Sequence, residues 1–303
     1  MSLTPVTQEV VKLAGNGERY ENKKLTGRIE VTGENVTIKN DEIITTGTCG
    51  SKVGEVTSLS ECTSQSILAL GNGLTVSHVK MGGSEAKGRN AVEECAKIFA
   101  TGLTMEYDRI ENCGGIKPDG GGTIAHNYAL DNLVLSEEHY EPLSDDTLVG
   151  TVSPPIIIKE NTFLNPHNQT AAIFLQGAST TEHGAEAHGI GEVRIENNFL
   201  AGGGYLIYGA EQPEENRPPV GKEIITGNRF ARACHGNATV LGEYGHHYCA
   251  GQTEIAGNDG TLWTTMGDGY YPFGGSYGID AYMGKNLTWS GNYWDDNKEP
   301  AGP

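Results

Sequence analysis

The sequence predicts an all-β protein built as a parallel β-helix, a solenoid of short strands with loop excursions on its surface and an Asn/Asp ladder at one corner. The first observation behind this prediction is a phrase of the form apolar-x-x-Asn-x-apolar that returns along the chain. The second is the β-branched and aliphatic composition of the segments that carry the phrase. The third is that none of these segments is followed by a helix-period run with caps, which disfavours an α/β horseshoe.

The repeated phrase can be aligned on its first apolar residue, the anchor. The nine anchors are Ile38, Val76, Met105, Ile124, Ile158, Ile195, Ile225, Ile255 and Trp289. Three residues on stand Asp41, Val79, Asp108, Asn127, Asn161, Asn198, Asn228, Asn258 and Asn292. Five residues on stand Ile43, Met81, Ile110, Ala129, Phe163, Leu200, Phe230, Gly260 and Trp294. The spacing of the anchors, from 19 residues (Met105 to Ile124) to 38 (Ile38 to Val76), is typical of a solenoid whose coils carry loops of different length.

The anchor segments favour strands because they are rich in Val, Ile and Thr, as in Ile156–Ile158 and Val193–Ile195. Asn at a fixed position after each strand predicts a tight corner, since Asn tolerates the left-handed backbone conformation. Its amide can also form hydrogen bonds along a stack of identical neighbours. We therefore expect the anchors to form one core and the Asn side chains one ladder.

Three motifs resemble a known family: Asn35–Asn40, Ile225–Phe230 and the closing Ser290–Asp296. They are similar to single-chain right-handed β-helix proteins of the pectate-lyase-like superfamily, in particular to the versions found in actinobacteria and in the tails of their phages. The resemblance covers about Tyr20 to Asp296. It implies a fold that hosts lyases, hydrolases, phage spikes and inert scaffolds, so it leaves the function open.

The chain divides into three parts. Residues 1–19 lack the phrase and are expected to form an N-terminal cap or arm, because a solenoid must cover its open end. Residues 20–296 form the predicted β-helix domain, in which Trp289 and Trp294 close the C-terminal end of the core. Residues 297–303 are a C-terminal tail.

The net charge of −18 argues against binding to nucleic acid or to an anionic membrane, since both need clustered Lys and Arg. It also argues mildly against a strongly anionic polysaccharide. The sequence has no transmembrane run, keeps Met1, and lacks the basic start and apolar stretch of a secretory signal. These features favour a protein that needs no signal, such as one released by lysis, over a secreted one whose signal was removed.

The six cysteines show no Cys-x-x-Cys spacing. Cys62, Cys95 and Cys113 fall near successive coils, where they could stack as small buried residues. Disulfides such as Cys49 with Cys62 or Cys234 with Cys249 are the alternative. Reduced core thiols are the favoured interpretation for a protein assembled in a cytoplasm.

Weak candidates for catalysis are Lys117, Asp119, His139, Asp145 and Asp146. They are weak because neither the paired-Asp-plus-His pattern of a polygalacturonase nor the Arg-rich strand of a pectate lyase is present, and acidic loop residues are more often solvated surface. The loop Glu182–His188 could hold a metal ion if it folded on itself, but its spacing fits no ligand motif, so no metal site or cofactor is expected. Calcium would enter only with a lyase activity.

An aromatic loop, Gly260–Gly284, is the strongest candidate for binding, together with the tyrosines and histidine just before it. The candidate residues are Tyr244, His246, Tyr248, Trp263, Asp268, Tyr270, Tyr271 and Tyr277. Aromatic faces beside carboxylates suit sugar rings or a protein interface. Packing of the loop over the coil is the alternative.

The resemblance to phage tail proteins, together with the missing signal, the retained Met1 and the lack of a clear catalytic set, implies a non-catalytic phage virion protein, a minor tail or surface-decoration subunit. Its expected partners are other virion proteins or a host-surface polysaccharide, and self-association is left open. The alternative is a secreted polysaccharide lyase or glycoside hydrolase of the same fold class.

Overall fold

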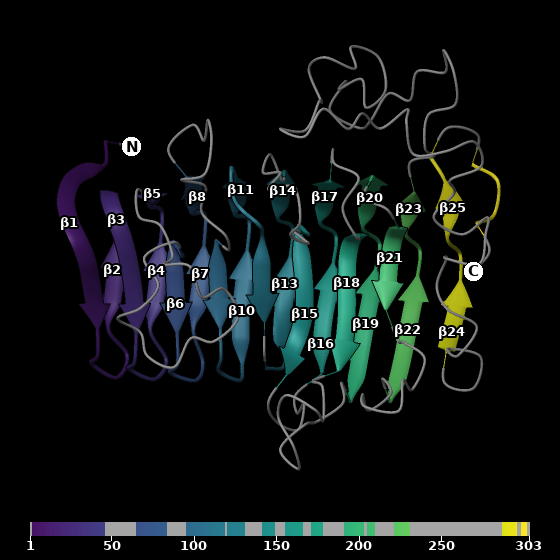
Figure 1. Cartoon of the computed structure of the whole chain (residues 1–303), viewed down its shortest axis with the longest axis horizontal. Coiled ribbons are helices and arrows are strands. Elements are labelled where there is room, and N and C mark those ends of the chain that lie inside the picture. Colours follow the sequence, from purple (N-terminus) through teal and green to yellow (C-terminus); the bar gives the residue numbers. More distant parts are fainter. Residues whose placement is uncertain are drawn as a thin grey trace.

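A computed structural model describes residues 2–45, 65–83, 95–118, 120–130, 141–148, 155–165, 171–177, 191–202, 205–209, 221–230, 287–295 and 298–301. Every regular element within these ranges is a β-strand. Neighbouring strands pair in parallel and form two large sheets, stacked from the N-terminal to the C-terminal end of the molecule (Figure 1).

The nine-stranded sheet contains one strand from each repeat that the structure describes. Its order is β2 (Arg19–Glu21), β4 (Thr37–Lys39), β7 (Thr75–Ser77), β10 (Leu103–Glu106), β13 (Gly122–Ala125), β16 (Ile156–Lys159), β19 (Glu192–Glu196), β22 (Lys222–Thr226) and β24 (Leu287–Ser290). These are the anchor strands of the sequence phrase. Tyr20 pairs with Ile38, so β2 adds a repeat that the phrase search did not include.

The 16-stranded sheet consists of two runs that meet at the long strand β3 (Lys23–Val31). One run is β5 (Glu42–Thr45), β8 (Lys80–Gly83), β11 (Arg109–Glu111), β14 (Tyr128–Leu130), β17 (Thr162–Asn165), β20 (Phe199–Gly202), β23 (Arg229–Phe230) and β25 (Tyr293–Trp294). The other is β6 (Ile67–Ala69), β9 (Ala96–Ile98), β12 (Ile116–Pro118), β15 (Leu143–Leu148), β18 (Ala171–Gly177) and β21 (Tyr205–Gly209).

The chain visits the nine-stranded sheet, then the first run, then the second run, and then returns. We call one such circuit a coil. This arrangement is compatible with a parallel β-solenoid, and it confirms the predicted all-β class with parallel sheets. The described anchors Ile38, Met105, Ile124, Ile158, Ile195 and Ile225 are at most 1% exposed and belong to one continuous core, as predicted, whereas Ile255 lies outside the described residues.

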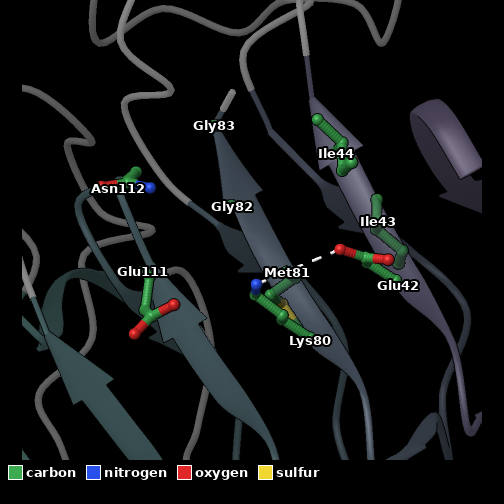
Figure 2. Close-up of a pocket in the computed structure, with 9 residues that line it drawn as sticks. All are labelled: Glu42, Ile43, Ile44, Lys80, Met81, Gly82, Gly83, Glu111 and Asn112. Atoms are coloured by element: carbon green, nitrogen blue, oxygen red, sulfur yellow. Dashed lines mark ion pairs between the residues drawn. The ribbon is translucent and has the colours of Figure 1, made fainter. Parts of the chain in front are cut away.

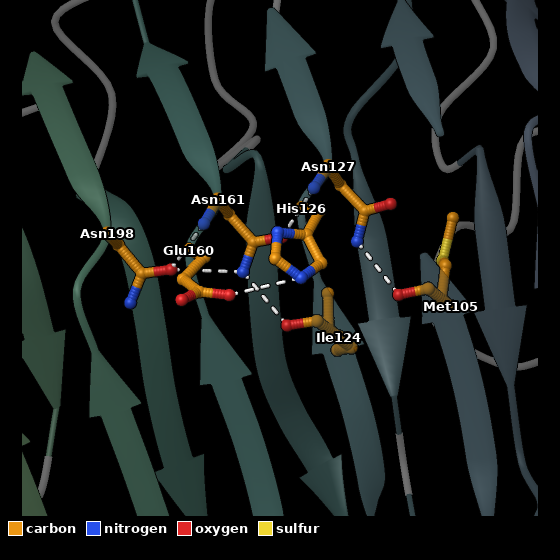
Figure 3. A network of polar contacts seen from close by, with 7 residues as sticks. All are labelled: Met105, Ile124, His126, Asn127, Glu160, Asn161 and Asn198. Atoms are coloured by element: carbon orange, nitrogen blue, oxygen red, sulfur yellow. Dashed lines mark hydrogen bonds and ion pairs between the residues drawn. The ribbon is translucent and has the colours of Figure 1, made fainter. Parts of the chain in front are cut away.

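The predicted ladder lies at the corner between the nine-stranded sheet and the β5–β25 run (Figure 3). The Oδ1 atom of Asn198 accepts the backbone N–H of Asn161 at 2.9 Å, and its Nδ2 atom donates to the carbonyl of Ile158 at 2.9 Å. Nδ2 of Asn198 also lies 3.0 Å from Oδ1 of Asn228. Each rung therefore satisfies buried backbone groups of the coil before it, which would otherwise have no partner.

One detail of the ladder differs from the sequence prediction. The left-handed residue of each corner precedes the ladder residue: Asn197 has a φ of 56°, whereas Asn198 is not among the positive-φ residues. The ladder residue instead turns inward, where its amide is buried. The rung after Asn228 is Asn292, whose Oδ1 accepts the N–H of Asn228 at 2.9 Å, whereas Asn258 lies outside the described residues.

Both ends of the stack are covered by the chain itself. At the N-terminal end, β1 (Thr4–Leu13) runs parallel to β3. At the C-terminal end, Trp289 and Trp294 pack on Phe230, with ring centroids 6.0 and 6.3 Å away, as expected for a core plug. The indole N–H of Trp289 donates to the carbonyl of Ala301 at 2.7 Å, which holds the tail against the last coil.

Cys95 and Cys113 form a disulfide between adjacent coils, with a Cα–Cα distance of 5.5 Å. Both residues are buried in the core, at 0% and 1% exposure. The expectation of reduced, stacked thiols is therefore wrong for this pair, although the stacking itself is right. Cys49, Cys62, Cys234 and Cys249 lie outside the described residues.

We predict that Asn198→Leu lowers the free energy of unfolding by about 1–3 kcal/mol, because the N–H of Asn161 loses its acceptor inside the protein. Urea unfolding measures the change. Asn197→Gly is the matched control, since it alters the neighbouring left-handed residue without touching the ladder, and it should change stability by less than about 0.5 kcal/mol. Equal losses in both variants would contradict the assigned role of the rung.

We further predict that Cys95→Ala/Cys113→Ala costs about 3 kcal/mol, the loop-closure contribution for a loop of this size. Non-reducing peptide mapping should recover the two cysteines in one linked peptide. Alkylation of Cys113 in the untreated, denatured protein would show that the bond is missing.

Candidate functional site

Most of the residues predicted to bind or react lie outside the described residues. These are Asp119, His139, Tyr244, His246, Tyr248, Trp263, Asp268, Tyr270, Tyr271 and Tyr277. Asp145 and Asp146 are described by their backbone alone, in β15. Lys117 lies in β12 and pairs in register with Lys97 of β9. β12 pairs with β15 at Ile116 and Leu143, so the backbones of Lys117, Asp145 and Asp146 lie on neighbouring strands, and the catalytic prediction stays a prediction.

An exposed ridge follows the corner outside the ladder. It is formed by the left-handed residues Asn40, His78, Tyr107, His126, Glu160 and Asn197, whose φ angles lie between 56° and 60°. The ring of Tyr107 stacks between His78 and His126, with centroids 5.1 and 4.7 Å away. His126 Nε2 lies 3.0 Å from Glu160 Oε2 (Figure 3).

This ridge presents ring edges to solvent. Both faces of the Tyr107 ring are covered by imidazoles, yet the residue is 50% exposed. Sugar rings stack on aromatic faces, and Tyr107 offers no free face for such stacking. It instead offers hydroxyl, imidazole and carboxylate groups as hydrogen-bonding partners along the corner.

A hollow of about 440 Å³ opens beside this ridge, on the outer face of β5, β8 and β11. It exists because Gly82 follows the inward-pointing Met81 and stands in register between Ile44 and Glu111, where it contributes no side chain (Figure 2). Only glycine fits there, because a Cβ atom would lie 1.7 Å from the carbonyl oxygen of Glu111. The gap in this row of outward side chains forms the floor of the hollow.

A second hollow, of about 420 Å³, shares Glu42 and Lys80 with the first and reaches the ridge at Asn40 and His78. We call the two together the outer groove. Glu42 lies 2.8 Å from Lys24 Nζ and 4.0 Å from Lys80 Nζ, and Glu111 lies 2.6 Å from Arg109. The groove therefore carries positive and negative side chains in alternation. Ion pairs between them are weak at an exposed surface, so a ligand's hydroxyl groups can replace one partner of a pair.

Three carboxyl groups with raised pKa values are buried, and one of them, Asp41, also lines the second hollow of the groove. Burial raises the pKa of Glu223 to about 8 and that of Asp41 to about 6, and it places that of Asp108 well above its usual range. All three are at most 3% exposed. The three groups belong to three different coils and are almost wholly buried, so they are not an exposed acid–base pair for chain cleavage.

In the described part of the chain, no three His, Cys, Asp or Glu residues are arranged to hold a metal ion. The same ranges contain no helix that is long and apolar enough to cross a membrane. Comparison of the chain with protein-family models, with curated proteins and with solved structures finds no match to any of them.

The outer groove was missed by the sequence analysis because its residues belong to three coils. Glu42, Lys80 and Arg109 each stand four residues after an anchor, so the register of the phrase does place them in one row. The next outward position is six residues after each anchor, where Ile44, Gly82 and Glu111 stand. Reading this position in the same way would have found the glycine gap.

We predict that Glu223→Leu stabilises the protein. Glu223 points inward, in register with Val193 and Leu287, and its carboxyl oxygens lack hydrogen-bond partners among the described residues. The unfolded chain releases this proton near pH 4.5 and the folded one near pH 8, so stability falls as the pH rises between these values. Thermal unfolding should show a gain of about 1–3 kcal/mol at pH 5 and a larger one at pH 9. Glu192→Gln on the outer face of β19 is the control, and a loss of stability in Glu223→Leu would contradict the assignment.

Proposed function

We propose that this chain is a non-catalytic right-handed parallel β-helix of the pectate-lyase-like type, and that it binds a surface glycan through the outer groove as part of a virion. The parallel stack of coils supports the fold assignment. The observation that carries the binding proposal is the outer groove, where a glycine gap is lined by Glu42, Lys80, Glu111 and Asn112. Carboxylate, ammonium and amide groups together bind hydroxyl-rich ligands.

The geometry of the groove favours an extended ligand. Adjacent strands repeat every ~4.8 Å, so a linear polymer that crosses β5, β8 and β11 meets a new row of side chains at each coil. The net charge of −18 disfavours polyanions. We therefore expect a neutral or amino-sugar-containing glycan.

The disulfide supports the secreted alternative, a polysaccharide lyase or glycoside hydrolase. Disulfides persist in oxidising surroundings and are rare in cytosolic proteins. Cys95 and Cys113 thus fit a protein that works outside the cell, whether secreted or carried on a released particle. Lys117 and Lys97 lie side by side in register, and Lys117 is the candidate base of this alternative.

The test is calorimetric titration of the protein with polysaccharides from bacterial envelopes, neutral and anionic. Lys80→Ala/Glu111→Gln should weaken binding of a neutral glycan at least tenfold without changing the melting temperature. Lys222→Ala/Glu192→Gln removes the same two kinds of charge from β22 and β19, outside the groove, where the two side chains lie 3.5 Å apart, and should bind normally.

Binding that survives in the groove variant, or that is lost in both variants, would contradict the proposal. Release of reducing or unsaturated sugars during the titration would favour the enzyme. Lys117→Ala should then abolish that release.

A further inference from the structure

The five Asn rungs define what the ladder position requires. In each of them Oδ1 accepts a corner N–H of the preceding coil, and Nδ2 donates to the carbonyl of that coil's anchor. The Nδ2 donors reach Met105, Ile124, Ile158, Ile195 and Ile225 at 2.8–3.0 Å. Figure 3 shows the contacts to Met105 and Ile124. The position therefore calls for an acceptor on one side of the side chain and a donor on the other.

Asp108 occupies the same position with a carboxyl group. It is 2% exposed, and its Oδ1 accepts the N–H of Val79 at 2.7 Å, as an Asn would. With Oδ1 bound as in the Asn rungs, we infer that the planar group places Oδ2 where those rungs have Nδ2, toward the carbonyl of the anchor Val76. Oδ2 has no hydrogen-bond partner among the described residues. An ionised oxygen would repel that carbonyl, whereas a protonated one would donate to it.

We propose that Asp108 is a neutral carboxylic acid in the folded protein and donates a hydrogen bond from Oδ2–H to the carbonyl of Val76, so that it forms a pH-dependent rung. Asp41 repeats the arrangement at the N-terminal end of the ladder. Its Oδ1 accepts the N–H of Lys23 at 2.6 Å, its Oδ2 has no partner within the described ranges, and the preceding anchor is Tyr20.

The surroundings of Asp108 favour the neutral form. Burial is the main cause of the raised pKa of this carboxyl, the charge of Glu106 adds to it, and the amides of Val79 and Glu106 oppose it. The other titratable or charged residues beside these contacts are Lys80 and His78 near Val79, Arg109 and Tyr107 on either side of Asp108, and His126 next to Asn127. None of them contributes to the shift in pKa, so no cation compensates the buried charge.

The direction of the pH effect follows from the raised pKa. The unfolded carboxyl loses its proton near pH 3.8, while the folded one keeps it, so the rung stabilises the fold in acid and loses this contribution as the pH rises. For Asp41 the loss falls between pH 3.8 and about 6. Asp41 and Asp108 immediately precede β5 and β11, two strands of the outer groove, so the corner beside the groove is more stable in acid.

Asp108→Asn tests the proposal, because Asn supplies the donor at every pH. Difference infrared spectra of wild type minus Asp108→Asn at pH 7 should show the carbonyl stretch of a protonated carboxyl. The melting temperature of Asp108→Asn should exceed that of wild type by about 3 °C or more at pH 9 and match it at pH 4. Glu34→Gln removes one exposed negative charge outside the ladder and should leave the pH profile unchanged.

The reverse substitution, Asn127→Asp, places a carboxyl in the next rung. It should lower the melting temperature more at pH 9 than at pH 4. A carboxylate signal from Asp108 at pH 7, or a difference between Asp108→Asn and wild type that does not change with pH, would overturn the proposal. So would an Asn127→Asp variant that is equally affected at both pH values.

Discussion

The hydrogen bonds of the ladder amides are the constraint on which the rest of this structure depends. Each coil must turn sharply between the two sheets, and the turn leaves a backbone N–H buried at the corner. Asn supplies an acceptor for that N–H and a donor for the anchor carbonyl of the same coil, as Asn161 does for Asn127 and Ile124. Because one amide serves both groups, it fixes the position of each coil relative to the next.

A fixed corner separates the inner positions of the coil from the outer ones. Inner positions must pack against the coils above and below, so Ile158 and Phe163 are fully buried. Outer positions are free of that requirement and can differ between coils. The outer groove arises from such a difference, because Gly82 stands between Ile44 and Glu111 in an outward row. The regular core thus provides a rigid base for an irregular surface.

The phrase identified the anchors, the buried positions and most ladder residues from the sequence, because each is set by one repeated local requirement. It did not give the distance along the chain between rungs, because Asn228 and Asn292 are direct neighbours in the ladder although they are 64 residues apart. The disulfide was missed although the separation of its cysteines, 18 residues, is close to the shortest anchor spacing. The groove was not predicted because it depends on the register of side chains in three neighbouring coils. The binding role of the aromatic loop stays a prediction.

Hydrogen exchange of the corner amides tests the central claim most directly. The N–H groups of Asn127, Asn161, Asn198 and Asn228 all donate to the side chain of the next rung at 2.9 Å. If the ladder holds the coils together, these four amides should exchange as slowly as those of the core strands, through global unfolding. Exchange at the rates of exposed loop amides would show that the corner opens independently and that the coils are held by their core alone.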